Sequence, residues 1–166
     1  FQILSISKNL KVKAESLILD KKGLEKLQNC LFLIHSGIER NSEKIIEEQQ
    51  KELDIFEAYD QIKAIGKSSV GYIKRGEIDK LSISMDNHWK IKKRLTKTIS
   101  NSSIDRMYLE LKSFGSHGGK IIGAGGGGFF LMVVDKNQNE FIRKAKEANF
   151  KFIDFKFESK GAHKLE

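Results

Sequence analysis

The feature that constrains this chain most is a run of glycine: five of the six residues at positions 123–128 are glycine, in the order GAGGGG. Apolar, strand-like residues lie on both sides, KII at 120–122 and FFLMVV at 129–134. Glycine in regular structure is less stable than alanine by roughly 0.5–1 kcal/mol, so five represent about 2.5–5 kcal/mol. Because a folded domain is stable by only about 5–15 kcal/mol, this stretch needs a reason. Either its backbone takes positive φ angles repeatedly, or a ligand such as phosphate contacts consecutive N–H groups.

Two phosphate-binding motifs resemble this stretch but do not fit its surroundings. Gly123, Gly125 and Gly128 match the dinucleotide fingerprint G-x-G-x-x-G, which must open a helix. Residues 129–134 are instead aromatic and β-branched, which is typical of a strand. A P-loop is excluded because no Gly-Lys-Ser/Thr sequence follows. What remains is a strand–loop–strand hairpin around residues 123–128, the glycine loop; a hairpin turn without a ligand is the plain alternative.

The bulk composition indicates a globular protein: 39% of the residues are hydrophobic, 31% are charged, and the formal net charge is +8. A chain of 166 residues suits a single domain with a real core. No apolar run approaches the roughly 20 residues that span a bilayer. The single cysteine, Cys30, fits a reducing compartment, and we expect a cytoplasmic protein. Because Cys30 lies in the continuous apolar run CLFLI at 30–34, we expect its thiol to be buried and inert. The chain opens inside a strand-like run, which suggests a fragment of something longer.

Hydrophobic periodicity predicts an α+β chain. Strands are expected at residues 1–6, 12–19, 30–36, 120–122, 129–134 and 152–157, and helices at 22–28, 41–66, 68–75, 77–97, 102–114 and 137–148. Gly66 is expected to end the long helix, Ser102 to form a capping box with Asp105, and Asn137 to cap the last helix. From Cys30 onward the order β-α-β-β-α-β predicts a ferredoxin-like antiparallel sheet covered by helices, with an enlarged first crossover.

Residues 120–129 resemble the third, C-terminal glycine-rich motif of the GHMP kinases, which phosphorylate small hydroxyl-bearing metabolites with ATP. Three flanking motifs are similar to the sugar-phosphate branch, and most of all to the D-glycero-D-manno-heptose 7-phosphate kinases: DNHWKIK at 86–92, ISNxxID at 99–105 and GGKxxGAG at 118–125. The resemblance runs over the whole chain. It implies ATP and Mg²⁺ as cofactors and transfer of the γ-phosphoryl group to a sugar hydroxyl, the anomeric one in the heptose kinases.

The same resemblance implies a division of the chain. Residues 1–20 would be a strand pair left from the N-terminal kinase domain, and residues 21–166 would be the C-terminal domain. In the family, the nucleotide loop and the catalytic aspartate both lie upstream of this point, so no catalytic residue is assigned here. We therefore expect the chain to be inactive alone and to work with the N-terminal half of the same kinase on a sugar phosphate, without a membrane or a nucleic acid.

Candidate phosphate- and substrate-binding residues come from the glycine loop and two neighbouring motifs. They are Gly123, Ala124, Gly125, Gly126, Gly127, Gly128, Lys120, Arg40 and Ser36. Ser36 and Arg40 belong to the sequence SGIERNS at 36–42, which is similar to a turn of the sugar kinases and places an arginine beside a helix start. A plain N-cap by Asn41 or Ser42, with Arg40 on the surface, explains this sequence equally well.

Basic side chains near the glycine loop are further candidates. Lys120, at the mouth of the hairpin, can pair with phosphate oxygens or be an ordinary exposed lysine at a strand end. The resemblance implies that one or two lysines of an earlier basic cluster reach a substrate phosphate; its members are Lys90, Lys92, Lys93 and Arg94. His117 borders the glycine loop and can approach substrate. The four histidines show no metal-ligand spacing, so we expect no metal site built by the protein.

Two other functions stay open at this point. A basic, ferredoxin-like domain can bind RNA by stacking bases on exposed sheet aromatics, here Phe129, Phe130, Phe152 and Phe155. Against RNA binding, neither strand carries the basic-Gly-aromatic pattern of such modules. The chain can also be a non-catalytic structural fragment, because the nucleotide loop of the family is not in it.

Overall fold

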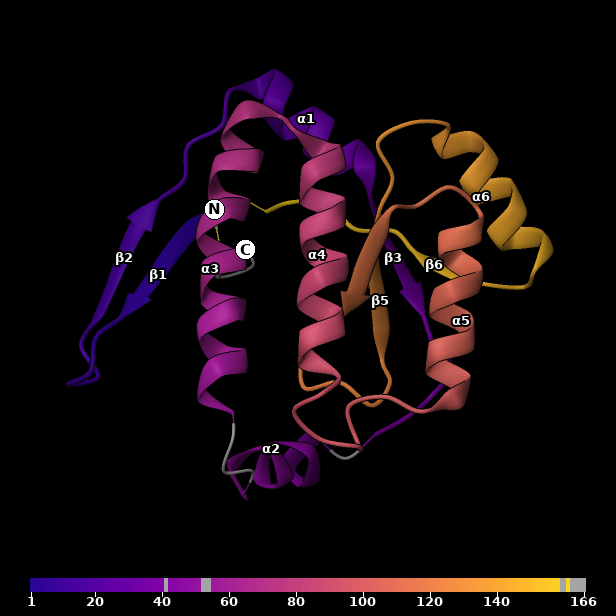
Figure 1. The fold of residues 1–166 in the computed structure, drawn as a ribbon. Coiled ribbons are helices and arrows are strands. Elements are labelled where there is room, and N and C mark those ends of the chain that lie inside the picture. Colours follow the sequence, from indigo (N-terminus) through magenta and orange to yellow (C-terminus); the bar gives the residue numbers. More distant parts are fainter. Residues whose placement is uncertain (41, 52–54, 159–160, 162–166) are drawn as a thin grey trace, which may run out of the picture.

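The structure, a computed structural model, describes residues 1–40, 42–51, 55–158 and 161. These residues form short strands and six helices (Figure 1). In order, the elements are β1 (Gln2–Ile6), β2 (Val12–Ser16), α1 (Lys21–Cys30), β3 (Leu31–His35), α2 (Ser42–Lys51), α3 (Phe56–Arg75), α4 (Ile78–Lys92), α5 (Ser102–Ser113), β4 (Gly118–Ile121), β5 (Phe129–Val133), α6 (Gln138–Glu147) and β6 (Lys151–Ile153). None of these helices combines the length and the apolar character needed to cross a membrane.

The larger sheet has the strand order β4-β5-β3-β6, and all its neighbouring strands are antiparallel. This order, with helices between β3 and β4 and between β5 and β6, is the ferredoxin-like arrangement predicted from residue 30 onward. Ile34 of β3 and Phe130 of β5 face each other across the centre of the sheet, and both are fully buried. The apolar runs of β3 and β5 thus form the two central strands, where burial of Ile34 and Phe130 away from water stabilises the sheet.

Three helices supply the core above this face of the sheet. Trp89 of α4, Tyr108 of α5 and Phe141 of α6 are buried with Phe130 in one cluster. The ring centroids of Tyr108 and Phe130 are 6.3 Å apart, as are those of Trp89 and Tyr108. Helix α4 contacts α3 and also the edge strand β4, and Figure 1 shows α3 and α4 side by side. The enlarged crossover therefore covers the sheet with more helices than the simple fold requires.

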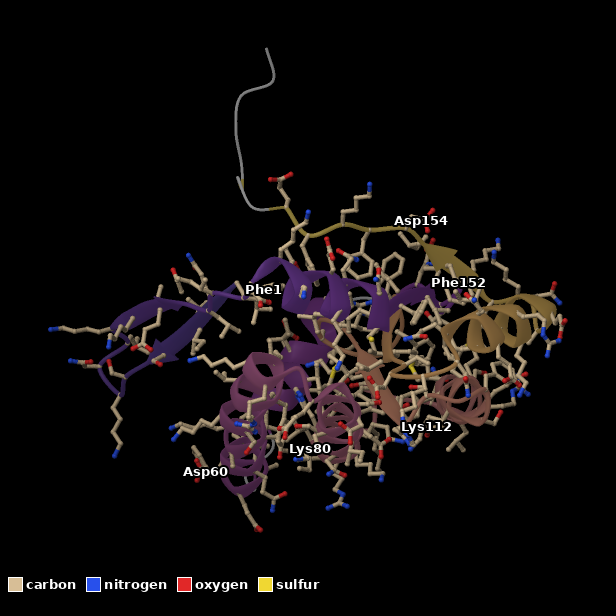
Figure 2. All side chains as sticks on the ribbon, turned by 90° about the horizontal axis from the view of Figure 1, so that it is seen from above. Phe1, Asp60, Lys80, Lys112, Phe152 and Asp154 are labelled. Atoms are coloured by element: carbon tan, nitrogen blue, oxygen red, sulfur yellow. The ribbon has the colours of Figure 1, made fainter. Side chains whose placement is uncertain are left out.

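The hairpin β1–β2 stands away from the rest of the molecule in both views (Figures 1 and 2). It forms the predicted strand pair, although β2 ends at Ser16. Its apolar side chains Leu4, Ile6 and Val12 are exposed. At its base, the rings of Phe1 and Phe157 meet edge to face, with centroids 4.7 Å apart, so the start of the hairpin contacts the segment that follows β6.

The long helix predicted over residues 41–66 is in fact two helices, α2 and α3. Gly66 does not end a helix but lies inside α3, where no neighbouring atom approaches the position of a side chain. Gly76, with φ of +64°, ends α3 instead. Asn41 and Leu53, which the prediction included, lie outside the described residues. Gly66 is a weak stop signal because glycine inside a helix costs only about 1 kcal/mol relative to alanine, and packing against α4 outweighs it.

Other predicted element ends also moved. The cap of α5 is Asn101 rather than Ser102: the Asn101 side chain accepts a hydrogen bond from the Ile104 amide. Asn137 precedes α6 in the left-handed conformation and makes no side-chain cap. The last strand ends at Ile153, well short of residue 157.

Cys30 closes helix α1 instead of starting the next strand, and it is buried. Burial raises the pKa of its thiol. The prediction of a buried thiol is confirmed, and the raised pKa disfavours the thiolate, which is the reactive form.

Candidate functional site

Strands β4 and β5 form the predicted hairpin around the glycine loop. Ile121 pairs with Phe130, and the Ile122 amide donates to the Phe129 carbonyl at 3.0 Å. All five glycines of the loop have positive φ, between 73° and 148°. Repeated positive φ angles, one of the two explanations considered for the glycine run, therefore account for its composition, since other residues rarely adopt such angles.

The rest of the protein also packs tightly against the loop backbone. The amide of Gly126 donates to the Ile99 carbonyl at 2.7 Å, and the amide of Gly128 donates to the Ile38 carbonyl at 3.0 Å. A Cβ atom at Gly126 would lie 2.6 Å from Cδ1 of Ile45. Two of the loop amides therefore donate to the protein itself. The predicted phosphate site cannot use these two N–H groups, so it cannot be an unbroken run of consecutive amides.

Three other loop amides have no such partner. Within the described part of the chain, the N–H groups of Gly123, Gly125 and Gly127 donate to no protein acceptor. A backbone N–H needs water or a ligand when the protein offers it nothing. These alternate amides are the donors that the loop can give to an anion.

Arg40 reaches the loop through its side chain. Its Nη1 donates to the Gly127 carbonyl at 2.6 Å, and its Nη2 lies 3.5 Å from the Ile122 carbonyl. Its Nε is buried and has no partner in the described structure. The alternative of an ordinary surface arginine is therefore wrong, while the proposed cap at Asn41 lies outside the described residues.

Ser36 lies directly beside the loop and is buried. Its amide donates to the Gly128 carbonyl at 2.8 Å, and its hydroxyl accepts a hydrogen bond from the Ile38 amide at 3.2 Å. Ser36 is thus brought to the predicted site, where its contacts hold the turn against the loop.

Two further cations and a histidine line the same region. Nζ of Lys92, in the last turn of α4, donates to the Gly123 carbonyl. Nζ of Lys120 lies 3.2 Å from Nδ1 of His88. Burial lowers the pKa of Lys120 to about 8, helped by the charge of Lys92. Burial also lowers the pKa of His88 to about 4, helped by the charges of Lys120 and then Lys92. Burial and then Arg40 lower the pKa of Lys92.

Arg40, Lys92 and Lys120 form what we call the loop cation cluster. No ion pair joins any of the three to a carboxylate within the described residues. Glu39 and Glu43 line an open hollow together with Arg40. Like charges held close together and partly out of water favour an anion as a further partner.

The sequence named Lys120 and Arg40 but did not single out Lys92 or His88. Lys92 stood in a basic cluster whose other members include Lys90 and Lys93, which pair with Asp86 and Asp105 in the structure. One signal was present: His88 and Lys92 are four residues apart and so share a face of α4.

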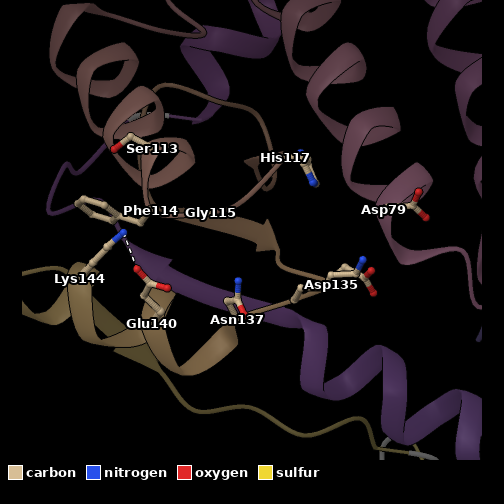
Figure 3. Close-up of a pocket in the computed structure, with 10 residues that line it drawn as sticks. Asp79, Ser113, Phe114, Gly115, His117, Asp135, Asn137, Glu140 and Lys144 are labelled. Atoms are coloured by element: carbon tan, nitrogen blue, oxygen red, sulfur yellow. Dashed lines mark ion pairs between the residues drawn. The ribbon is translucent and has the colours of Figure 1, made fainter.

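His117 is not part of this site. It precedes β4, at the opposite end of that strand from the glycine loop. There it lines a separate pocket of about 470 Å³, together with Asp79 of α4 and Asp135 after β5 (Figure 3). The expectation that His117 approaches substrate at the loop is therefore wrong, because neighbours in sequence separate along a strand at about 3.3 Å per residue.

Two of the four aromatic residues expected to stack RNA bases pack against the protein itself. Phe130 is fully buried, and the Phe152 ring packs against Phe32 and Phe141. The described chain also has no group of three or more His, Cys, Asp or Glu side chains arranged to hold a metal ion.

Comparison with known families and sequences gives one family and two curated relatives. Residues 69–151 match the family model "GHMP kinases C terminal". The chain is 24% identical over 165 residues to the D-glycero-alpha-D-manno-heptose 7-phosphate kinase of Campylobacter jejuni, covering 97% of this chain and 49% of the relative. It is 22% identical to the bifunctional fucokinase/GDP-fucose pyrophosphorylase of Arabidopsis thaliana, covering 86% of this chain and 14% of that protein. The chain thus spans about half of the first relative.

Solved kinase structures share the fold. The L. major mevalonate kinase in complex with R-mevalonate has a TM-score of 0.70 at 15% identity, over 88% of this chain and 44% of its own. A putative sugar kinase from Campylobacter jejuni has a TM-score of 0.66 at 22% identity, over 95% and 45%. A D-glycero-D-manno-heptose 1-phosphate kinase from Bacteroides thetaiotaomicron has a TM-score of 0.60 at 19% identity, over 96% and 46%.

Proposed function

We propose, because this chain belongs to the GHMP kinase C-terminal family, that it forms the C-terminal part of an ATP-dependent sugar-phosphate kinase. The substrate that we propose is D-glycero-D-manno-heptose 7-phosphate, phosphorylated on its anomeric hydroxyl. Similarity to the C. jejuni heptose 7-phosphate kinase over 97% of this chain supports this choice. The fold alone does not select a substrate, since mevalonate kinases share it.

The observation that carries the proposal is the loop cation cluster. Arg40, Lys92 and Lys120 gather at one glycine loop, and none of them pairs with a carboxylate among the described residues. A sugar phosphate and a nucleotide triphosphate are both strongly anionic. Burial first, and repulsion between the cations second, lower the pKa of Lys120 and of Lys92, and either anion would relieve that repulsion.

The loop residues have a direct part in this proposal. Phosphoryl transfer requires alignment of the reacting oxygens and donors for the charge on the equatorial oxygens. The amides of Gly123, Gly125 and Gly127 would donate to those oxygens, and Lys120 and Lys92 would neutralise their charge. Ala124, Gly126 and Gly128 complete the loop, and Ser36 holds its end through the Gly128 carbonyl.

ATP fits this site through its phosphates, and when bound it would supply the γ-phosphoryl group. Mg²⁺ finds no ligand set among the described side chains, so we assign it no residue and no step here. We assign no catalytic residue either. The catalytic base and the nucleotide loop would come from the N-terminal half of the kinase, which makes this chain inactive alone.

The hairpin β1–β2 supports a partner of that kind. Its side chains at Leu4, Ile6 and Val12 are apolar, exposed and outside the core of the main sheet. Apolar area of this kind gains about 25 cal/mol per Å² when it is covered. We propose that the N-terminal half covers this hairpin and that the enzyme works in the cytoplasm.

A kinase assay on the protein that contains this chain and an N-terminal half tests the proposal. We expect ATP-dependent phosphorylation of heptose 7-phosphate with a kcat/KM at least about 100-fold above that for the same heptose without its phosphate, because the cations have no dianion to bind in the latter. Mevalonate is the matched control for the shared fold. If a folded protein phosphorylates no sugar phosphate, the chain has a structural role and the proposal is wrong.

A further inference from the structure

The guanidinium of Arg40 lies within the glycine loop rather than beside it. It donates to the Gly127 carbonyl near the end of the loop and approaches the Ile122 carbonyl just before its start. A single side chain therefore bridges the two ends of the loop. Its third donor, Nε, is buried and has no acceptor in the described structure, so its two Nη groups make its hydrogen bonds.

The glycines at the two ends of the loop leave room for this guanidinium. A Cβ atom at Gly123 would lie 2.8 Å from Nη2 of Arg40, and one at Gly128 would overlap Nη1. Any side chain at Gly128 would thus displace the arginine. These two positions are shaped around a group of this protein, and a bound phosphate is not needed to explain them.

Arg40 also fixes the direction of a loop donor. In a trans peptide, the C=O of one residue and the N–H of the next point in opposite directions. A guanidinium that holds the Ile122 carbonyl therefore orients the Gly123 amide, which is one of the loop donors without a protein acceptor. Lys92 also reaches the loop backbone, at the Gly123 carbonyl, but as a single point charge.

We propose that Arg40 is a positioning residue: it sets the shape of the glycine loop by bridging the Ile122 and Gly127 carbonyls and does not itself bind the substrate anion. The expected effect on kcat rests on the proposed function, whereas the expected effect on the shape of the loop does not. A planar guanidinium can reach two carbonyls at once, whereas an ammonium is a single point charge. The two roles of Arg40 therefore predict different results for a lysine in its place.

The kinetic test uses Arg40→Ala and Arg40→Lys in the complete kinase, with Arg106→Ala as the control at an exposed arginine of α5. We expect both Arg40 variants to lose about 100-fold in kcat, because a displaced loop misaligns the reacting groups, while KM for the sugar phosphate changes by less than about threefold. The control should match the wild type. A KM that rises at least tenfold with an unchanged kcat, or an Arg40→Lys variant with near-normal kcat, would overturn the inference.

Chemical rescue sharpens this test. Guanidinium chloride at about 50 mM is far below the molar concentrations that unfold proteins. It should restore at least about tenfold of the lost kcat in Arg40→Ala, because the free cation can fill the vacated position. Sodium and ammonium chloride at the same concentration should restore nothing; equal rescue by all three salts would contradict a bridging role.

A third measurement does not depend on kinase activity. Hydrogen exchange of the Gly126 and Gly128 amides, measured without nucleotide or sugar, should be at least about tenfold faster in Arg40→Ala than in the wild type. Guanidinium should slow it again, while amides of β3 stay unchanged. Unchanged exchange at both glycines would overturn the inference. Faster exchange in a protein that phosphorylates no sugar would leave the inference standing and refute only the proposed function.

Discussion

The lysines at the first residues of β4 are paired with a carboxylate, whereas the cations at the loop that follows β4 are not; we call the first end balanced and the second unbalanced. Near Gly118 and Gly119, the carboxylate of Asp86 is buried and accepts hydrogen bonds from Tyr108 at 2.7 Å and from Lys112 at 2.9 Å. Lys90 adds a third contact at 2.7 Å. At the glycine loop, three cations meet backbone carbonyls and a neutral histidine but no carboxylate among the described residues.

Helix α4 contributes to both ends, so the contrast is not one of local sequence composition. Asp86 and Lys90 are four residues apart and form an ion pair. His88 and Lys92 have the same spacing, but the pKa of each is lowered: burial comes first for both, followed by Lys120 and Lys92 for His88 and by Arg40 for Lys92. An internally balanced group stabilises the fold, while an unbalanced group that remains close together is a candidate for binding an external anion.

The largest expected effect comes from breaking the unbalanced end. Gly126→Val places a side chain against Ile45 at φ of +73°. Its matched control is Gly76→Val at φ of +64°, where the nearest atom, on Lys26, is 3.8 Å from the added Cβ. Both variants should lose about 1–2 kcal/mol of unfolding free energy from the left-handed conformation. Only Gly126→Val should also lose at least about 100-fold in kcat/KM, because it distorts the loop donors.

Steady-state kinetics with thermal unfolding of the same preparations separates the two effects. Near-normal kinetics in Gly126→Val would refute a role for the loop in phosphoryl transfer. An equal loss of activity in Gly76→Val would assign the effect to stability alone.

Breaking the balanced end should affect the fold instead. Asp86→Asn keeps the size of the side chain but removes the charge that Lys90, Lys112 and Tyr108 contact. We expect a loss of about 2–3 kcal/mol in unfolding free energy, below the full figure for a buried pair because Lys90 is largely exposed. The kcat of the folded fraction should stay within about twofold.

The measurement is denaturant unfolding at neutral and acidic pH. Burial favours a raised pKa for Asp86, but the hydrogen bonds of Lys90, Lys112 and Tyr108 outweigh it and the pKa is lowered. A carboxyl group whose pKa is lowered by folding stabilises the folded state at pH values above its ordinary pKa. This stabilisation is lost as the pH falls through the pKa of the folded state. The part of the wild-type loss of unfolding free energy in acid that comes from Asp86 should therefore be absent in Asp86→Asn. If Asp86→Asn lost as much unfolding free energy in acid as the wild type, other groups would be responsible.

Local sequence was sufficient for the hairpin, and long-range contacts were needed for the site. The glycine loop between two apolar runs predicted β4 and β5, because strand signals and turn residues act over a few positions. The amides of Gly126 and Gly128 are taken by the carbonyls of Ile99 and Ile38, which are distant in the chain. No local sequence pattern shows which of the loop N–H groups remain without a protein acceptor once these long-range contacts have formed.

The same reason explains the cations. Lys90, Lys92 and Lys93 are equivalent by composition, and only the positions of Asp86 and Asp105 in the fold decide which of them is neutralised. The division of residues 41–66 into α2 and α3 was likewise missed because helical periodicity continues across it.

A smaller effect compares two neighbouring lysines of α4. Lys92→Met should raise KM for the sugar phosphate about tenfold, because it removes one charged contact between the protein and the anion. The unfolding free energy should change little. Lys90→Met is the control: it should leave KM unchanged and cost less than about 1 kcal/mol, because its partner Asp86 keeps Lys112. Equal effects on KM would show that the basic cluster acts through its overall charge, without a distinction between the two ends of β4.

The smallest effect is a shift in pH dependence. The pKa of Lys120 is about 8 because of burial first and the charge of Lys92 second. Since this value lies below that of the unfolded chain, 10.5, the unfolded state binds more protons between those pH values, and stability rises with pH across that window. Anion binding should show the opposite trend and weaken as the pH rises through about 8, because Lys120 loses its charge there.

Sulfate is the suitable probe for this trend because it does not titrate in the range. Its affinity for the chain, measured by calorimetry from about pH 6.5 to 9.5, should fall with a midpoint near the pKa of Lys120. Lys92→Met removes one cause of the lowered pKa, so the midpoint should move to higher pH even though the overall affinity is weaker. Lys120→Met should make the profile flat. A midpoint that Lys92→Met leaves in place would mean that burial alone sets the pKa of Lys120, and that the two lysines do not share an anion.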